Sequence, residues 1–340
     1  MENLPKWCPS SMCKLKSMKD YYSNPMNVDS EHFTIKKIID GVWATISTPG
    51  GSHICNSGII DLGDETLIFD TGLCRESAND LRNTALDLTG RIPSIVVNSH
   101  LHSDHFWGNS VFHEARVITS QENVRITEPK WKQAGEQTYY SAKGAIEEAR
   151  RQLDSESEYE REYAKIFTGY LSGIIDTWPS LEYKTPDDTF NGSMSLKGNE
   201  RSIEIIEYRN GHSESDCVVH LPKEKIVFTG DLCYIGFHPC LDLGDPLNTL
   251  NILDQLNVLE VETVVPGHGF VGDSGAFDDM KEYIQTLVGL VRGIVSNEGS
   301  REEAESIPVP EKYLGLQMRD FFYKRNMGCL YGILSDVSKC

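Results

Sequence analysis

Short runs of apolar, β-branched residues recur along the chain from residue 34 onward, and many of them are bounded by Gly, Asp or Asn. Runs of this length and composition predict β-strands. The predicted strands are residues 34–39, 42–47, 58–62, 66–69, 95–98, 116–119, 203–208, 217–221, 226–229 and 263–265. Between the strands, apolar residues recur at helical spacing, as in residues 77–88 and 277–294. Strands that alternate with helices predict a layered α/β domain.

One long, strongly charged segment, residues 131–178, has no strand pattern and predicts a helical insertion. In its second half, apolar and aromatic residues fall at i, i+4, i+7, i+8, i+11, i+12 and i+15, which gives the helix one apolar face. The residues of this face are Tyr159, Tyr163, Ile166, Phe167, Tyr170, Leu171 and Ile174. We expect the insertion to pack against another part of the protein through this face.

The same patterns divide the chain into three parts. Residues 1–30 mix Pro, Ser, Lys and Met without a clear period and predict an irregular N-terminal arm. Residues 31–275 contain the predicted strands and form the main domain. Residues 276–340 predict a C-terminal helical extension.

The charge balance of the 340 residues is strongly acidic, with 32 Lys and Arg against 51 Asp and Glu and a net charge of −19. Such a surface repels phosphate backbones, so a nucleic acid is not expected as a partner. No apolar run is long enough for a membrane span, and the first residues lack the apolar core of a secretory signal. The nine cysteines form no CxxC pair, which is typical of reduced thiols. We therefore expect a cytoplasmic protein that acts on a small-molecule substrate and does not contact membranes, and a homo-oligomer is possible.

The sequence SHLHSDHFWGN at residues 99–109 is the sharpest chemical feature. His100 and His102 follow an apolar run two residues apart, so both imidazoles point to the same side if the chain is extended there. They can then share one metal ion. Asp104 and His105 come after the chain has turned and can face a second ion, about 3.5–4 Å from the first in paired metal sites.

Four further residues stand just beyond the ends of predicted strands. They are Asp70 in IFDTG, His212 in NGHSESD, Asp231 in FTGD and His268 in VVPGHG. Open α/β sheets gather their functional residues where the strands end. We therefore expect these side chains to meet the cluster at residues 100–105.

In their order and spacing, these motifs resemble those of the metallo-β-lactamase superfamily over roughly residues 34–275. The resemblance implies a four-layer αβ/βα sandwich, to which this chain adds the helical insertion and the C-terminal helices. It also implies two divalent metal ions, with zinc as the first choice and manganese or iron as alternatives. The implied ligands are His100, His102 and His212 for one ion, Asp104, His105 and His268 for the other, and Asp231 between them. Asp70 would orient a ligand by hydrogen bonding, and Asp70 and Asp104 are the implied catalytic residues.

Two such ions would lower the pKa of a shared water from 15.7 towards about 7, so that a metal-bound hydroxide could attack a carbonyl group. We expect a hydrolase of a small ester, thioester or lactone, because the Asp at position 231 resembles the glyoxalase II and lactonase branches. β-Lactamases of the superfamily generally carry Cys or Ser at this position, so that activity is less expected. Two alternatives remain open: a mononuclear non-haem iron oxidoreductase acting on a thiol or persulfide, and a catalytically idle ligand-binding sensor.

The residues that contact the substrate are harder to predict. Tyr234 and His238 follow Asp231 closely and are candidates, although packing of a loop explains them equally well. Cys233 is interpreted as a small buried residue and not as a nucleophile. The insertion, attached between the first metal motif and His212, is expected to lie over the pocket mouth and to supply apolar contacts. The alternative is that its apolar face packs against outer helices or a second subunit.

Overall fold

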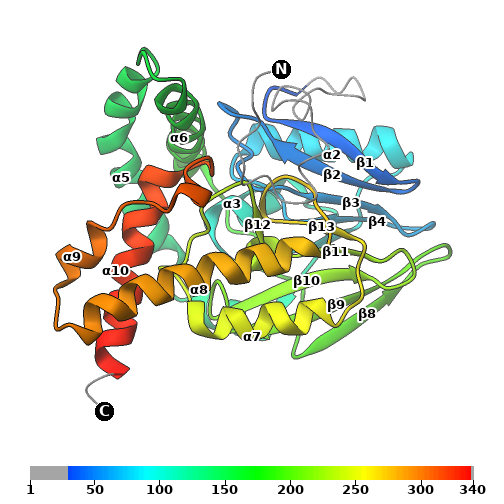
Figure 1. The fold of residues 1–340 in the computed structure, drawn as a ribbon. Helices are drawn as coiled ribbons and strands as arrows, with labels where there is room; N and C mark the ends of the chain where they lie inside the picture. The colour runs from blue at the N-terminus through cyan, green and yellow to red at the C-terminus, as the bar shows by residue number, and fades with distance from the viewer. Residues whose placement is uncertain (1–29, 338–340) are drawn as a thin grey trace, which may run out of the picture.

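In a computed structural model that describes residues 30–337, two β-sheets face each other and helices cover their outer faces (Figure 1). The first sheet has its strands in chain order, antiparallel from β1 to β4 and parallel from β4 to β7. Its strands are β1 (Phe33–Ile39), β2 (Val42–Ser47), β3 (Gly58–Asp61), β4 (Thr66–Phe69), β5 (Ile95–Val97), β6 (Arg116–Ser120) and β7 (Asp188–Phe190).

The second sheet has the strand order β13-β11-β10-β9-β8, and a small third sheet pairs β12 with β14. Their strands are β8 (Ser193–Lys197), β9 (Ser202–Arg209), β10 (Ser215–Leu221), β11 (Ile226–Phe228), β12 (Tyr234–Ile235), β13 (Thr263–Val265) and β14 (His268–Gly269). All ten predicted strands are present, with ends that differ by at most two residues. The sequence analysis missed β7, β8, β12 and β14, which are short or largely exposed.

The core between the two sheets follows from the period-two alternation of their strands. In β2, Val42, Ala44 and Ile46 point into this core, and in β9, Ile203 and Ile205 do so while Glu204 between them is exposed. Because a shift of one residue would turn the apolar set outward, this alternation fixes the register of each strand.

Two outer layers of helices complete the sandwich. Helix α2 (Arg75–Thr89) packs on the outer face of the first sheet through Ala78, Leu81 and Ala85. Helices α7 (Pro246–Asn257) and α8 (Gly275–Ser296) cover the second sheet. The predicted four-layer αβ/βα architecture is therefore confirmed.

Helical additions extend the sandwich at one end (Figure 1). After the short α4 (Gln121–Thr127), the insertion forms a hairpin of α5 (Trp131–Gln152) and α6 (Glu158–Thr177), followed by a 3-10 turn, η2 (Trp178–Ser180). The C-terminal part adds α9 (Arg301–Glu305), a 3-10 turn η4 (Glu311–Tyr313) and α10 (Arg319–Val337). Among residues 30–337, no helix combines the length and apolar character needed to span a bilayer. Apart from Ser30, the predicted N-terminal arm lies outside the described residues.

Candidate metal centre

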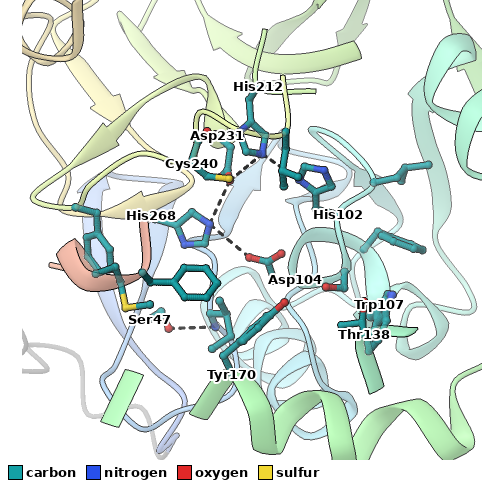
Figure 2. Close-up of a pocket in the computed structure, with 18 of the residues that line it drawn as sticks. Ser47, His102, Asp104, Trp107, Thr138, Tyr170, His212, Asp231, Cys240 and His268 are labelled. Carbon is teal, nitrogen blue, oxygen red and sulfur yellow. Dashed lines mark hydrogen bonds and ion pairs between the residues drawn. The ribbon is translucent and has the colours of Figure 1, made fainter. Parts of the chain in front are cut away.

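The candidate metal ligands lie where strands of both sheets end. The loop after β5 carries His100 and His102 and leads into α3 (Ser103–Phe106), a single turn that carries Asp104 and His105. His212 follows β9, Asp231 lies in the 3-10 turn η3 (Gly230–Leu232) after β11, and His268 begins β14. The fold thus brings together the seven residues that the motifs suggested, and Figure 2 shows five of them around one cavity.

One group consists of His100, His102 and His212. Nδ1 of His102 lies 2.9 Å from Nε2 of His100 and 2.9 Å from Nε2 of His212. The three rings meet nearly edge to face, with interplanar angles of 80–85°. Three imidazole nitrogens converging on one point are a suitable ligand set for a transition-metal ion.

The second group consists of Asp104, His105 and His268. Oδ2 of Asp104 lies 3.6 Å from Nε2 of His105 and 3.4 Å from Nε2 of His268. Asp231 lies between the two groups: Oδ1 is 3.2 Å from Nε2 of His105, and Oδ2 is 3.3 Å from Nε2 of both His212 and His268. A carboxylate in this position could contact ions in both groups.

Three of the histidines have their outward ring nitrogens satisfied by protein groups. Nδ1 of His105 donates to Oδ2 of Asp70 at 2.8 Å, and Nδ1 of His212 donates to the carbonyl oxygen of Cys240 at 3.3 Å. Nδ1 of His100 donates to Oγ of Ser99 at 2.9 Å, and that hydroxyl donates in turn to Asp70. These bonds select the tautomer that leaves each Nε2 as a lone pair facing the centre.

Two inward atoms test whether the site fits a cation. Nε2 of His105 and Oδ1 of Asp231 are buried, and neither has a hydrogen-bond partner among the described residues. Buried polar atoms are seldom left without a partner, because desolvation without a compensating bond costs about 1–3 kcal/mol. A metal ion between them would satisfy both, so these residues fit the cation that the motifs imply.

Burial and the charges of neighbouring side chains shift the pKa values of the residues in this cluster. Burial, together with the neighbouring histidines, lowers the pKa of His100 well below its ordinary value and that of His102 to about 3. For His105 and His268 burial acts in the same direction, but the nearby carboxylates, Asp231 above all, outweigh it and raise the pKa. For Asp231, burial is outweighed by the histidines, which lower the pKa of its carboxyl group. His100 and His102 are thus neutral and Asp231 ionised near pH 7, as metal ligands must be.

Asp70 supports the centre from behind. It is fully buried after β4, and besides His105 it accepts hydrogen bonds from the backbone N–H and the hydroxyl of Ser99, both at 2.7 Å. Its backbone is in the left-handed region with φ of 59°, a conformation found at sites where the surroundings enforce it. Sequence reasoning missed Ser99; its position directly before His100 at a strand end was the available signal.

A second support holds the loop that carries His268. Nδ2 of Asn56 donates to the carbonyl oxygens of Pro266 (3.0 Å) and Gly269 (2.9 Å), and its backbone N–H donates to that of Gly267 (2.7 Å). A Cβ atom at position 267 would lie 2.0 Å from Oδ1 of Asp231, so this approach requires glycine. No sequence motif of the metal ligands pointed to Asn56.

The two substrate candidates occupy different environments. Tyr234 lines the cavity, donates a short hydrogen bond from its hydroxyl to Asp231 and stacks on the ring of His268. His238 does not line the cavity. Its ring is buried, Nε2 donates to the carbonyl oxygen of Tyr313 at 3.2 Å, and Nδ1 accepts from the hydroxyl of Tyr283 at 2.8 Å. The structure therefore corrects the prediction for His238, which packs the C-terminal extension and does not face the substrate.

A cavity of about 450 Å³ opens directly over the metal-ligating side chains (Figure 2). Helix α6 of the insertion contributes Ile166, Phe167 and Tyr170 to its wall, and Tyr170 points into it near Asp104. The apolar face of the insertion thus faces the pocket in part. Farther along the same face, Tyr159 packs against Arg319 of the C-terminal extension. The apolar face therefore lines the pocket with one part and packs against another helix with the other, so each of the two arrangements expected from the sequence describes part of this face.

Comparison with known protein families shows the family to which this chain belongs. The sequence model of the metallo-beta-lactamase superfamily matches residues 50–268, which include every candidate ligand. The chain belongs to the metallo-β-lactamase superfamily. No curated protein matches the sequence significantly.

Solved structures of this superfamily share the fold at low sequence identity. A metallo-beta-lactamase from Pontibacter korlensis is 17% identical, with a TM-score of 0.55 over 74% of this chain and 99% of its own. The metallo-beta-lactamase FIM-1 from Pseudomonas aeruginosa, in its mono-zinc form, is also 17% identical, with a TM-score of 0.53 over 75% of this chain and 95% of its own. At this identity the similarity concerns the fold.

Proposed function

We propose that this protein is a hydrolase that acts through a dinuclear metal centre on a small ester, thioester or lactone. The observation that carries the proposal is the position of Asp231, within 3.2–3.3 Å of histidines from both ligand groups. A shared carboxylate with three further ligands on each side is the arrangement expected of a paired-metal site. Membership of a superfamily that consists mostly of hydrolases supports the proposal.

In this proposal, His100, His102 and His212 hold one ion and Asp104, His105 and His268 hold the other. When bound, two divalent cations supply a hydroxide nucleophile at neutral pH and polarise the scissile carbonyl group. The protein keeps the ligands in their productive tautomers through Asp70, Ser99 and the Cys240 carbonyl. Tyr234 carries a hydroxyl group in the cavity wall that can position the substrate.

Several alternatives are less well supported. A mononuclear iron oxidoreductase would need only one ligand group, whereas this chain has a second convergent group in Asp104, His105 and His268. An idle sensor has no need for seven convergent ligands. A β-lactamase activity is not proposed, because the superfamily's β-lactamases generally have Cys or Ser where Asp231 stands, and the structural neighbours share only the fold.

The test combines a metal count with a substrate screen. Protein stripped with a chelator and reconstituted with zinc or manganese should contain two ions per chain by plasma emission. It should hydrolyse at least one compound among aryl esters, thioesters and lactones, and the stripped protein should not. A fully active enzyme that holds one tightly bound iron and no second ion would overturn the dinuclear hydrolase, as would two bound ions with no turnover across the whole screen.

A further inference from the structure

Helix α6 of the insertion and helix α10 of the C-terminal extension meet beside the cavity, although more than 140 residues separate them in sequence (Figure 1). The rings of Phe167 on α6 and Phe321 on α10 lie 5.3 Å apart. Nearby, the guanidinium of Arg319 lies 4.1 Å from the centre of the Tyr159 ring, whose hydroxyl accepts from the backbone N–H of Asp320 at 3.3 Å. We call helices α6 and α10 the wall helices.

Hydrogen bonds fix α10 to the loop that follows the metal ligand Asp231. The residue before Met318, Gln317, donates from its N–H to the Gly236 carbonyl at 2.9 Å and accepts from the His238 N–H at 3.0 Å. Inside the helix, Asn326 donates to the Pro239 carbonyl at 2.8 Å and accepts from the Leu241 N–H at 3.0 Å. The extension is therefore an integral part of the site.

The wall helices give the cavity a large apolar surface. Helix α6 supplies Ile166, Phe167 and Tyr170, while Met318, Phe321 and Phe322 come from α10 and the turn before it. The cavity volume, about 450 Å³, lies in the range of about 300–1,000 Å³ that suits a ligand with many carbon atoms. An acetyl group would leave most of this surface in contact with water.

The charges in the wall do not favour an ionic substrate. Arg325 is paired with Asp242 through Nε (2.9 Å) and a terminal nitrogen (2.6 Å), and its guanidinium lies over the ring of Phe321. The other charged residues of the described wall, apart from metal ligands, are Lys130 and Glu214, which are exposed and opposite in sign. With a net charge of −19, the whole protein repels anions at a distance.

We propose that the substrate is an uncharged ester, thioester or lactone whose acyl part carries an extended apolar group that lies between the wall helices. This inference rests on the proposed hydrolase function and specifies its substrate class. Hydrolysis breaks the acyl C–O or C–S bond, a water oxygen forms the new C–O bond of the acid, and the leaving oxygen or sulfur takes up the proton. The apolar group remains in the cavity throughout, so its burial contributes to binding in every step.

The first experiment compares three p-nitrophenyl esters on the zinc-reconstituted enzyme. For the hexanoate ester, kcat/KM should exceed that for the acetate at least tenfold, because four added methylene groups are buried. The mono-adipate ester has the same chain length but ends in a carboxylate, and it should be at least tenfold poorer than the hexanoate. Equal rates for acetate and hexanoate, or a preference for the adipate, would overturn the inference.

The second experiment assigns the effect to the wall helices. Phe321→Gln should reduce the hexanoate-to-acetate ratio at least fivefold with unchanged metal content, whereas Phe321→Leu should keep most of the ratio because it restores an apolar contact. Tyr140→Ala is the matched control, since Tyr140 lies on α5, is 63% exposed and does not line the cavity. If Phe321→Gln retains the full ratio while folding normally, α10 does not contact the acyl group and the inference is wrong.

A binding measurement separates this inference from the proposed reaction. The neutral fluorescent probe N-phenyl-1-naphthylamine should bind the metal-free protein near Trp107 and Trp131 and quench their fluorescence, with at least fivefold weaker binding to Phe321→Gln. If no ester is hydrolysed but the probe binds in this way, the hydrolase proposal fails and the apolar binding site stands. If esters are hydrolysed but the probe binds both proteins equally or neither, the hydrolase stands and the wall-helix inference fails.

Discussion

Nδ1 of His105 lies 2.8 Å from Oδ2 of Asp70, and both side chains are completely buried. This bond directs the other ring nitrogen, Nε2, towards Asp231 and Asp104. Asp70 does not line the cavity over the ligands, so its effect on a metal ion would be transmitted through His105 and through Ser99.

Asp70→Asn should therefore weaken metal binding without removing a ligand. In Asp70, Oδ1 accepts from the backbone N–H of Ser99, and Oδ2 accepts from the Ser99 hydroxyl and from His105. The amide has one acceptor oxygen where the carboxylate has two, so its NH2 group faces one of these donors in either orientation, and the negative charge that stabilises the ligand tautomer is lost. We expect zinc affinity, measured by competition with a chromophoric chelator, to fall about 10–100-fold. Asp87→Asn, at an exposed position of α2, serves as the control. An affinity within twofold of the unchanged protein would contradict the positioning role.

Asp231→Ala should have a larger effect, because this carboxylate contacts histidines of both ligand groups. We expect most of the activity to be lost and the metal content to fall below two ions per chain by plasma emission.

Cys233→Ala, two residues away, separates metal-based from thiol chemistry. Cys233 is fully buried in the core under α7 and α8, and burial raises the pKa of its thiol far above neutrality. The substitution should cost about 1 kcal/mol of unfolding free energy and leave most of the activity. An inactive Cys233→Ala protein with both metals bound would require covalent thiol catalysis instead.

Asn56→Ala tests how the loop with His268 is held. The substitution leaves the carbonyl oxygens of Pro266 and Gly269 without their donor, at a cost of about 1–3 kcal/mol for each buried group. We expect the urea midpoint to fall and the metal stoichiometry to move from two towards one, because His268 belongs to only one ligand group. Asn251→Ala, at an exposed position of α7, should change neither quantity. Unchanged stoichiometry would mean that the loop is held by its other contacts alone.

The sequence was most informative where chemistry and local structure coincide. His100 and His102 follow a three-residue strand, and His212, Asp231 and His268 each follow the end of another. Because the strand ends of the two sheets converge, the local sequence patterns were sufficient to predict that these side chains lie close together. The fold class followed from the same alternation of strands and helices, together with the family resemblance.

The sequence was least informative where position depends on distant contacts. The proximity of His238 to Asp231 in sequence does not reveal that the chain after β12 bonds to Gln317, which directs the ring of His238 towards Tyr283. Likewise, the sequence of the apolar face of α6 does not show which helix packs against it. Phe167 and Phe321 are brought together only by the packing of α10. Strand β8 was missed because its residues are mainly polar and alternate between exposed and partly buried positions.

The buried position of His238 also predicts how stability depends on pH. Burial lowers the pKa of its imidazole to about 3, and the bond to the Tyr313 carbonyl opposes this only weakly. In the unfolded chain the ring is protonated below about pH 6.5. Since only the unfolded state takes up a proton between these values, the stability that the neutral ring contributes is complete above about pH 6.5 and is lost as the pH falls towards 3.

We therefore expect His238→Gln to reduce the loss of stability on acidification. Glutamine can still donate to the Tyr313 carbonyl and accept from the Tyr283 hydroxyl, but it does not titrate. Between pH 7.5 and pH 5.0, the free energy of unfolding measured in urea should fall by about 2 kcal/mol less in the variant than in the unchanged protein. Other titrating groups and the metal ligands are common to both proteins, so their contributions cancel in this difference. His113→Gln, which alters a histidine that is 72% exposed, should leave the pH dependence as it is. If the unfolding free energy falls equally in His238→Gln and in the unchanged protein, the ring of His238 accepts a proton in the folded state. The interpretation that this ring is neutral in the folded protein would then be wrong.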